Sequence, residues 1–197
     1  MSKDLNRLVV ATGPRVRIRL KDPSDALDDY SWRRDPDVSQ YDAVDPTALP
    51  FSDFLERLEN EIRFPHPDRR MYSLMDPAGT HIGNIMYYNV TASRDAAEVG
   101  ISIGVEAYRG AGLGTEAMIT FVRYLWDTTS FRLLFLHTLD WNERAQQCFR
   151  KAGFSATSRV LREPNVFVRM EARREWWLMH ENDGRFAKYL AARTPSL

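Results

Sequence analysis

Apolar and polar residues alternate along several short stretches of the chain, as they do in half-buried β-strands. The first stretch is VRIRL at 16–20, where apolar and basic side chains alternate before a polar turn. Three more extended stretches follow at 71–75, 81–90 and 97–105, and the turn residues DPAG at 76–79 favour a hairpin between the first two of these. The pattern therefore predicts a β-sheet.

Helical spacing of apolar residues predicts two helices between residues 25 and 63, separated by Pro36, Pro46 and Pro50. A longer amphipathic helix is predicted after Gly114. These helices supply the layers that cover the predicted sheet.

The second half of the chain also contains a nearly continuous apolar run at 132–139, which predicts a strand buried on both faces. The order of strand, helix and strand around it implies a parallel pair with a right-handed crossover. A helix at 142–152 and two extended stretches, around 155–162 and 165–172, complete the pattern.

Together these elements predict an α/β (mixed α+β) fold in a single domain over 1–197. We expect a mixed, mostly antiparallel sheet of about six to seven strands with a central parallel pair, flanked by helices. The core is expected at about 15–172, with a C-terminal helical tail at about 173–197. A chain of 197 residues is large enough to bury such a core.

Composition narrows the classes of function. Lys plus Arg and Asp plus Glu number 27 each, so the chain lacks the excess positive charge that gives nonspecific affinity for nucleic acid. The single cysteine, Cys148, has no second thiol for a disulfide or a zinc cluster, so we expect no metal site and a reducing compartment. The sequence shows no secretory signal pattern and no apolar run of membrane-spanning length. We expect a cytoplasmic protein without a nucleic-acid or membrane partner.

The stretch from Tyr108 to Thr115, YRGAGLGT, lies between a predicted strand and a predicted helix. Its glycines allow successive amides to point into one concavity at the helix N-terminus, which suits a pyrophosphate. A Walker loop is excluded because no Gly-Lys-Ser/Thr follows, and a dinucleotide fingerprint lacks its third glycine. Too little chain follows Asp140 to complete a dinucleotide fold. The remaining alternative is a glycine-rich turn that only packs helix against sheet.

This loop resembles the cofactor loop of the GNAT superfamily of N-acetyltransferases, Arg/Gln-x-x-Gly-x-Gly/Ala, which residues 109–114 match. A second family pattern runs Asn-x-x-Ala/Ser-x-x-x-Tyr-x-x-x-Gly-Phe. Its positions are held here by Asn142, Ala145, Phe149, Gly153 and Phe154. The resemblance is sharp over 97–154 and looks closest to the branch of ribosomal-protein N-terminal acetyltransferases.

The resemblance implies acetyl transfer from acetyl-coenzyme A to a primary amine by direct attack in a ternary complex. It also implies that the central parallel strands splay apart and that the pantetheine arm joins the backbone between them. The residues implied to bind the cofactor are Ile103, Gly104, Val105, Arg109, Gly110, Ala111, Gly112, Leu113, Gly114, Thr115 and Asn142. Small side chains at Gly100, Ser102 and Gly104 would leave room for the ligand, or else mark a bulge or tight packing.

Amide formation needs a neutral amine, so the site must first remove a proton from an ammonium group. Glu98 is the candidate base, and His137 in the buried strand is the alternative. The family's usual tyrosine, which protonates the departing thiolate, is replaced by Phe149, so water or Tyr108 is left as the acid. Cys148 is expected to be a buried structural thiol.

The acceptor is expected to be cationic, because the segment 22–61 holds twelve Asp or Glu and only three Arg. A polyamine, an aminoglycoside-like compound or a peptide or protein amino terminus would fit, although charged helix faces are often merely solvated. Three roles are open for the tryptophans at 32, 141, 176 and 177: lining a groove, packing in the core or forming a homodimer contact. The rival functions are a noncatalytic acyl-coenzyme A binding module and a transferase that uses a bulkier acyl donor.

Overall fold

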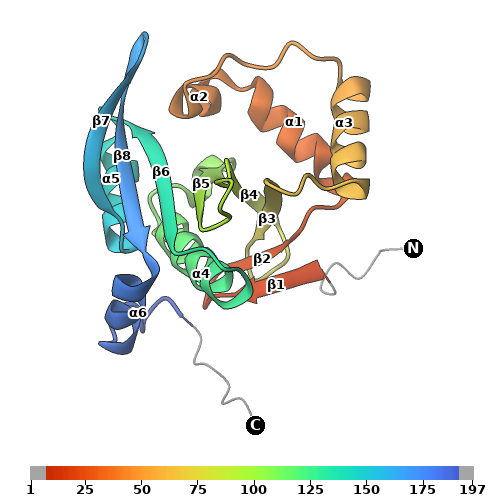
Figure 1. Ribbon diagram of the computed structural model, residues 1–197. Coiled ribbons are helices and arrows are strands. Elements are labelled where there is room, and N and C mark those ends of the chain that lie inside the picture. The colour runs from red at the N-terminus through yellow and green to blue at the C-terminus, as the bar shows by residue number, and fades with distance from the viewer. Residues whose placement is uncertain (1–7, 191–197) are drawn as a thin grey trace.

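Eight strands form one sheet in the order β1-β2-β3-β4-β5-β6-β8-β7, as Figure 1 shows for the computed structural model, which describes residues 8–190. Every neighbouring pair is antiparallel except β5 and β6, which are parallel. The strands are β1 (Val9–Thr12), β2 (Arg17–Leu20), β3 (Arg70–Met75), β4 (His81–Tyr88), β5 (Ala96–Ile103), β6 (Leu133–Leu139), β7 (Ser155–Arg162) and β8 (Asn165–Arg173).

The predicted fold class is confirmed, including the single parallel pair and its helical crossover. The sheet has one strand more than expected, because β1 precedes the first predicted strand and pairs antiparallel with β2. Its sequence, VVAT, has no alternation of apolar and polar residues that would have identified it. In the described residues no helix is both long and apolar enough to cross a lipid bilayer.

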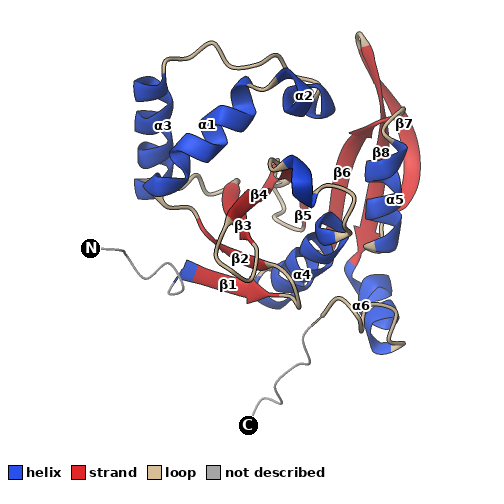
Figure 2. Cartoon of the chain, turned by 180° about the vertical axis from the view of Figure 1, so that it is seen from behind, coloured by secondary structure: helices blue, strands red, loops and turns tan. Residues whose placement is uncertain are grey.

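The helices fall into two groups, which Figure 2 shows apart from each other. The first group packs together in the segment between β2 and β3 and consists of α1 (Ala26–Arg34), α2 (Pro36–Ser39) and α3 (Phe51–Arg63). The second group consists of α4 (Leu113–Thr128), α5 (Glu143–Lys151) and α6 (Arg174–Asn182). The predicted break at Pro36 is real, but this proline also begins α2, where its missing N–H costs nothing.

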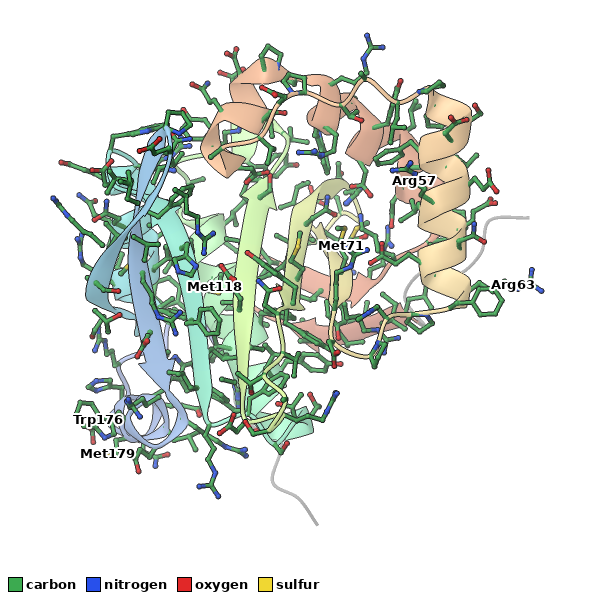
Figure 3. All side chains as sticks on the ribbon, turned by 45° about the horizontal axis from the view of Figure 1, so that its top comes forward. Arg57, Arg63, Met71, Met118, Trp176 and Met179 are labelled. Carbon is green, nitrogen blue, oxygen red and sulfur yellow. The ribbon has the colours of Figure 1, made fainter. Side chains whose placement is uncertain are left out.

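The hydrophobic core lies between α4 and one face of the sheet. The α4 residues Ala117, Met118, Phe121 and Leu125 are fully buried there, and Figure 3 labels Met118. Because side chains alternate along a strand, β5 gives its odd-numbered residues to this core. Its even-numbered residues, from Glu98 onward, therefore face the opposite side of the sheet.

β5 and β6 form a fork in the middle of the sheet. Their parallel pairing covers only Ala96 with Leu133, Ala97 with Leu134 and Glu98 with Phe135. Beyond Glu98 the two strands continue without pairing to each other, while β5 remains paired to β4 and β6 to β8. The expected splay is therefore present, and its vertex is at Glu98.

The C-terminal segment is docked onto the core as far as it is described. Trp177 of α6 is buried, stacks on Phe186 with ring centroids 4.6 Å apart, and donates a hydrogen bond to the carbonyl of Ala152. Trp176, labelled in Figure 3, is 63% exposed on the same helix. The part of the predicted tail at 191–197 lies outside the described residues, and a homodimer contact through this region stays a prediction.

Candidate active site

A cleft of about 1450 Å³ passes the open side of the fork and joins two different walls. One wall is formed by the glycine loop and α5. The other is formed by β3, β4 and the segment from α1 to the short helix at Gln40–Asp42. Glu98 and His137 line the cleft where these walls meet. The fork therefore provides one continuous space with two chemically distinct ends.

The glycine loop adopts the backbone that its sequence predicts. Gly110 and Gly112 have φ values of +80° and +82°, and Gly112 is the N-cap of α4. Such positive φ values strain residues that carry a Cβ, so glycine is required at both positions. Of the predicted cofactor residues, Ile103, Arg109, Gly110, Gly112, Gly114, Thr115 and Asn142 line the cleft. The loop thus presents a helix N-terminus to this end of the cleft, as an anionic group requires.

The other four predicted cofactor residues, Gly104, Val105, Ala111 and Leu113, are not among the residues that line the cleft. Leu113 is buried in the core, and the carbonyl of Ala111 accepts a hydrogen bond from Arg15 at 3.2 Å. The N–H of Val105, like that of Gly104, points to the carbonyl of Ile82.

Arg109 holds the end of β5 in place. Its Nε donates to the carbonyl of Ile103 at 3.0 Å, and its Nη2 donates to the carbonyl of Gly104 at 2.8 Å. Together with the N–H of Gly104, which donates to Ile82, these backbone atoms already have protein partners. Pantetheine binding by the backbone at 103–105 stays a prediction, and the edge of β5 that has no partner in β6 runs from Val99.

The space beside Gly104 is filled by a protein side chain, whereas Gly100 borders the cleft. A Cβ on Gly104 would lie 2.0 Å from Cδ2 of Trp32, whose ring therefore rests directly on this backbone. At Gly100 a Cβ would lie 3.5 Å from the ring of Tyr88 and 3.6 Å from Met86. The expectation that these small residues leave room for a ligand is wrong at Gly104, where tight packing explains the glycine. Gly100 and Ser102 line the cleft, so the expectation stays a prediction there.

Glu98 and His137 are directly hydrogen-bonded to each other across the fork. Nδ1 of His137 lies 2.7 Å from Oε1 of Glu98, and the side-chain amide of Asn89 donates to Oε2 at 2.9 Å. Both side chains are at most 8% exposed. The sequence offered these residues as alternative bases, but the parallel register of β5 and β6 makes them one pair.

The pairing fixes the protonation pattern of the imidazole. A carboxylate only accepts hydrogen bonds, so Nδ1 of the neutral ring carries the proton and Nε2 is left unprotonated. Within the described residues Nε2 forms no hydrogen bond, and His137 lines the cleft. The pair therefore offers a basic nitrogen to a group in the cleft, oriented by a buried carboxylate.

Two tyrosines line the cleft, and of these Tyr88 lies beside the pair whereas Tyr108 lies toward the other end of β5. Tyr108, the predicted acid, donates its hydroxyl proton to Asp76 at 2.7 Å, and this bond raises the pKa of Tyr108. Tyr88 lies opposite Glu98 in β4, and burial together with the neighbouring Glu98 carboxylate raises its pKa. Sequence reasoning missed Tyr88, because the register between two strands cannot be read from either strand alone.

The helix α5 supplies the remaining predicted residues. Asn142 caps α5 by accepting a hydrogen bond from the N–H of Ala145 at 3.1 Å, and it also lines the cleft. Phe149 is buried against Phe154, with no proton to donate. Cys148 borders the cleft beside Gly114, and burial raises the pKa of its thiol, which keeps it protonated at neutral pH.

Most of the paired carboxylates in the acidic segment 22–61 lie beneath α1 and not in the cleft. Asp25 is buried in an ion pair with Arg19, and Asp29 in one with Lys21. Among the described residues of this segment, Asp42 is the carboxylate that lines the cleft. Asp25 and Asp29 are therefore neutralised inside the protein and add little to the potential in the cleft.

Comparison with known proteins places these features in a family. Residues 15–155 match the family model described as an acetyltransferase (GNAT) domain. A search of curated protein sequences gives no match.

Several solved structures share the fold. A spermidine N-acetyltransferase from Vibrio cholerae, in complex with CoA and spermine, is 18% identical with a TM-score of 0.75, and the alignment covers 83% of this chain and 98% of that one. The aminoglycoside acetyltransferase AAC(6')-Ib, with coenzyme A and kanamycin, is 19% identical with a TM-score of 0.72, covering 84% and 99%. An uncharacterized protein from Bacillus halodurans is 14% identical with a TM-score of 0.73, covering 92% and 98%. At these identities the likeness shows the fold alone.

Proposed function

The chain belongs to the GNAT acetyltransferase family, and on that basis we propose that it transfers an acetyl group from acetyl-coenzyme A to a primary amine by direct attack in a ternary complex. The observation that carries the proposal is the position of the Glu98–His137 pair. It lies at the vertex of the fork, inside one cleft that has the glycine loop at its other end. The donor and the acceptor can therefore meet beside a base.

The donor fits the wall formed by the loop and α5. Gly110, Gly112 and Gly114 place backbone groups and a helix N-terminus along it, and Arg144 and Lys151 of α5 line the same cleft. A diphosphate is stabilised by such a combination of amides, helix dipole and cations. Acetyl-coenzyme A, when bound there, supplies an acyl group activated as a thioester.

The pair at the fork accounts for the proton that amide formation releases. An alkylamine with a pKa near ~10.4 is almost fully protonated at neutral pH. Nε2 of His137 accepts this proton, and Glu98 stabilises the resulting imidazolium through Nδ1. The neutral amine then attacks the thioester carbonyl carbon, and the carbon–sulfur bond breaks. The remaining extra proton on the attacking nitrogen passes to the departing thiolate, directly or through water, so that the amide and the free thiol are released. A thiol pKa of about 8.5 makes this leaving group tolerable without a dedicated acid.

The acceptor is proposed to be a cationic small-molecule amine. Glu98, Asp42 and Asp68 bring carboxylates to the cleft. The solved structures of similar fold include complexes with spermine and with kanamycin. Those names support small-molecule amines as acceptors and give no support to the ribosomal-protein branch. Acetylation of a peptide amino terminus is therefore an alternative result of the screen described below.

A noncatalytic acyl-coenzyme A binding module is the second candidate. The observation that favours it is Phe149, which is buried against Phe154 at the position of the family's usual tyrosine. On this alternative the chain binds acetyl-coenzyme A tightly and releases no thiol with any amine.

One screen separates these functions. Thiol release from acetyl-coenzyme A is measured with polyamines, aminoglycosides and short peptides that have free amino termini. The proposal expects release above background with at least one small cationic amine, and mass spectrometry should find the acetylated product. Release only with peptides would overturn the acceptor class, and tight donor binding without release would establish the binding module. A parallel series of longer acyl-coenzyme A thioesters tests the bulkier donor.

A further inference from the structure

Arg15 connects the turn between β1 and β2 to the glycine loop, although about a hundred residues separate them in the chain. Its Nη1 donates to the carbonyl of Ala111 at 3.2 Å. Its Nε donates to Oε2 of Glu116 at 2.9 Å, and its backbone N–H donates to Oε1 of the same carboxylate. One side chain therefore holds both the loop and the first turn of α4.

Glu116 is the buried, negatively charged partner of Arg15 in this contact. Its side chain is 1% exposed, whereas that of Arg15 is 50% exposed. A Cβ on Gly13 would lie 3.0 Å from Oε1 of Glu116, so the turn packs closely around the carboxylate. A buried negative charge this near the helix N-terminus opposes the binding of any anion there, unless a cation neutralises it. Arg15 is the cation that does so.

The loop geometry shows from which side Arg15 acts. Gly110, Gly112 and Gly114 line the cleft, but among the described residues neither Ala111 nor Arg15 does. The carbonyl of Ala111 is therefore drawn to the side of the loop away from the cleft. A peptide carbonyl that points toward a bound anion repels it, whereas one held away leaves the neighbouring amides to face the anion.

We propose that Arg15 is a positioning residue for the diphosphate of the acyl donor. It holds the Ala111 carbonyl away from the cleft and neutralises the buried Glu116 carboxylate, without itself contacting the donor. The inference rests on the proposed function, since it assumes that the loop binds the coenzyme A diphosphate.

The test compares donors that have and lack the diphosphate. Arg15→Ala should raise the Kd of coenzyme A at least about tenfold by calorimetry, because charge-assisted hydrogen bonds to the loop and to Glu116 are lost. Dephospho-coenzyme A, which keeps the diphosphate, should show the same loss. Turnover of S-acetylpantetheine, which has no phosphate, should stay within about twofold of wild type in kcat/KM, since phosphate contacts are absent.

A matched control removes an equal charge elsewhere. Arg57 is exposed on α3, as Figure 3 shows, and Arg57→Ala should leave all three ligands unaffected. If Arg15→Ala does not fold, Arg15→Gln is measured instead and should give the same pattern.

The inference is overturned if Arg15→Ala binds coenzyme A as wild type does, or if S-acetylpantetheine turnover falls as much as coenzyme A affinity. Wild type that binds no coenzyme A contradicts the proposed function itself, whatever Arg15 does.

Discussion

Replacing Gly104 by alanine should destabilise the protein through one contact, because the new Cβ would collide with Trp32. It would lie 2.0, 2.1 and 2.5 Å from three carbons of the indole ring, whereas carbon atoms pack best at about 3.5–4.0 Å. The ring is rigid and also packs on His81 with centroids 4.8 Å apart, so α1 must shift with it. Overpacking of this kind costs about 1–3 kcal/mol, and a lost aromatic contact adds about 1 kcal/mol.

Circular dichroism during heating measures the effect. For a domain of this size the expected fall in Tm is roughly 4–16 °C. Gly100→Ala, four residues earlier in β5, is the matched control, because its Cβ would meet Tyr88 and Met86 at ordinary contact distances. This control should be neutral or stabilise by up to about 1 kcal/mol. Equal melting temperatures for the two variants would refute the packing of Trp32 on the strand end.

Three further variants probe the loop, the α5 cap and the charges beneath α1. Gly112→Val should raise the Kd of coenzyme A at least about tenfold in calorimetry, because valine is strained at a φ of +82°; an unchanged Kd would remove the loop from the donor site. Asn142→Ala should cost about 1 kcal/mol of stability as a lost N-cap and also weaken donor binding, and a variant with normal kinetics would limit Asn142 to capping. Asp25→Asn should cost about 3–5 kcal/mol in urea unfolding, because Arg19 is left buried and unpaired. Burial alone would raise the Asp25 pKa, but the hydrogen bonds from Arg19 hold that pKa below its ordinary value. Wild type should therefore lose the stability that the Asp25–Arg19 pair contributes only as the pH falls below about 4. The Asp25→Asn variant should lack this acid dependence.

The local parts of the fold and site were predictable because they depend on short-range patterns. The period of apolar residues predicted most of the strands and the helix after Gly114. The glycine spacing predicted a turn at 110 and 112, where both residues have positive φ values. Asn142 caps α5, as an asparagine at the start of a helix commonly does.

The parts that sequence reasoning missed depend on register and on contacts distant in the chain. The pairing of Glu98 with His137 follows from the offset between two strands that are joined by a whole helix. Neither the contact of Trp32 with Gly104 nor that of Arg15 with Ala111 has a local signal. The same limitation applies to the charge count of the acidic segment, which does not reveal that Asp25 and Asp29 are neutralised by Arg19 and Lys21.

The pH dependence of turnover in Glu98→Gln tests the central claim most directly. The glutamine amide can donate to Nδ1 of His137, which moves the ring proton to Nε2 and removes the base from the cleft. With the best acceptor from the screen, kcat at neutral pH should fall roughly 10²- to 10⁴-fold while the Kd of coenzyme A is unchanged. The loss should shrink toward about pH 10, where the amine is increasingly deprotonated in solution. Parallel profiles with equal rates for wild type and variant would contradict the assignment of the Glu98–His137 pair as the base.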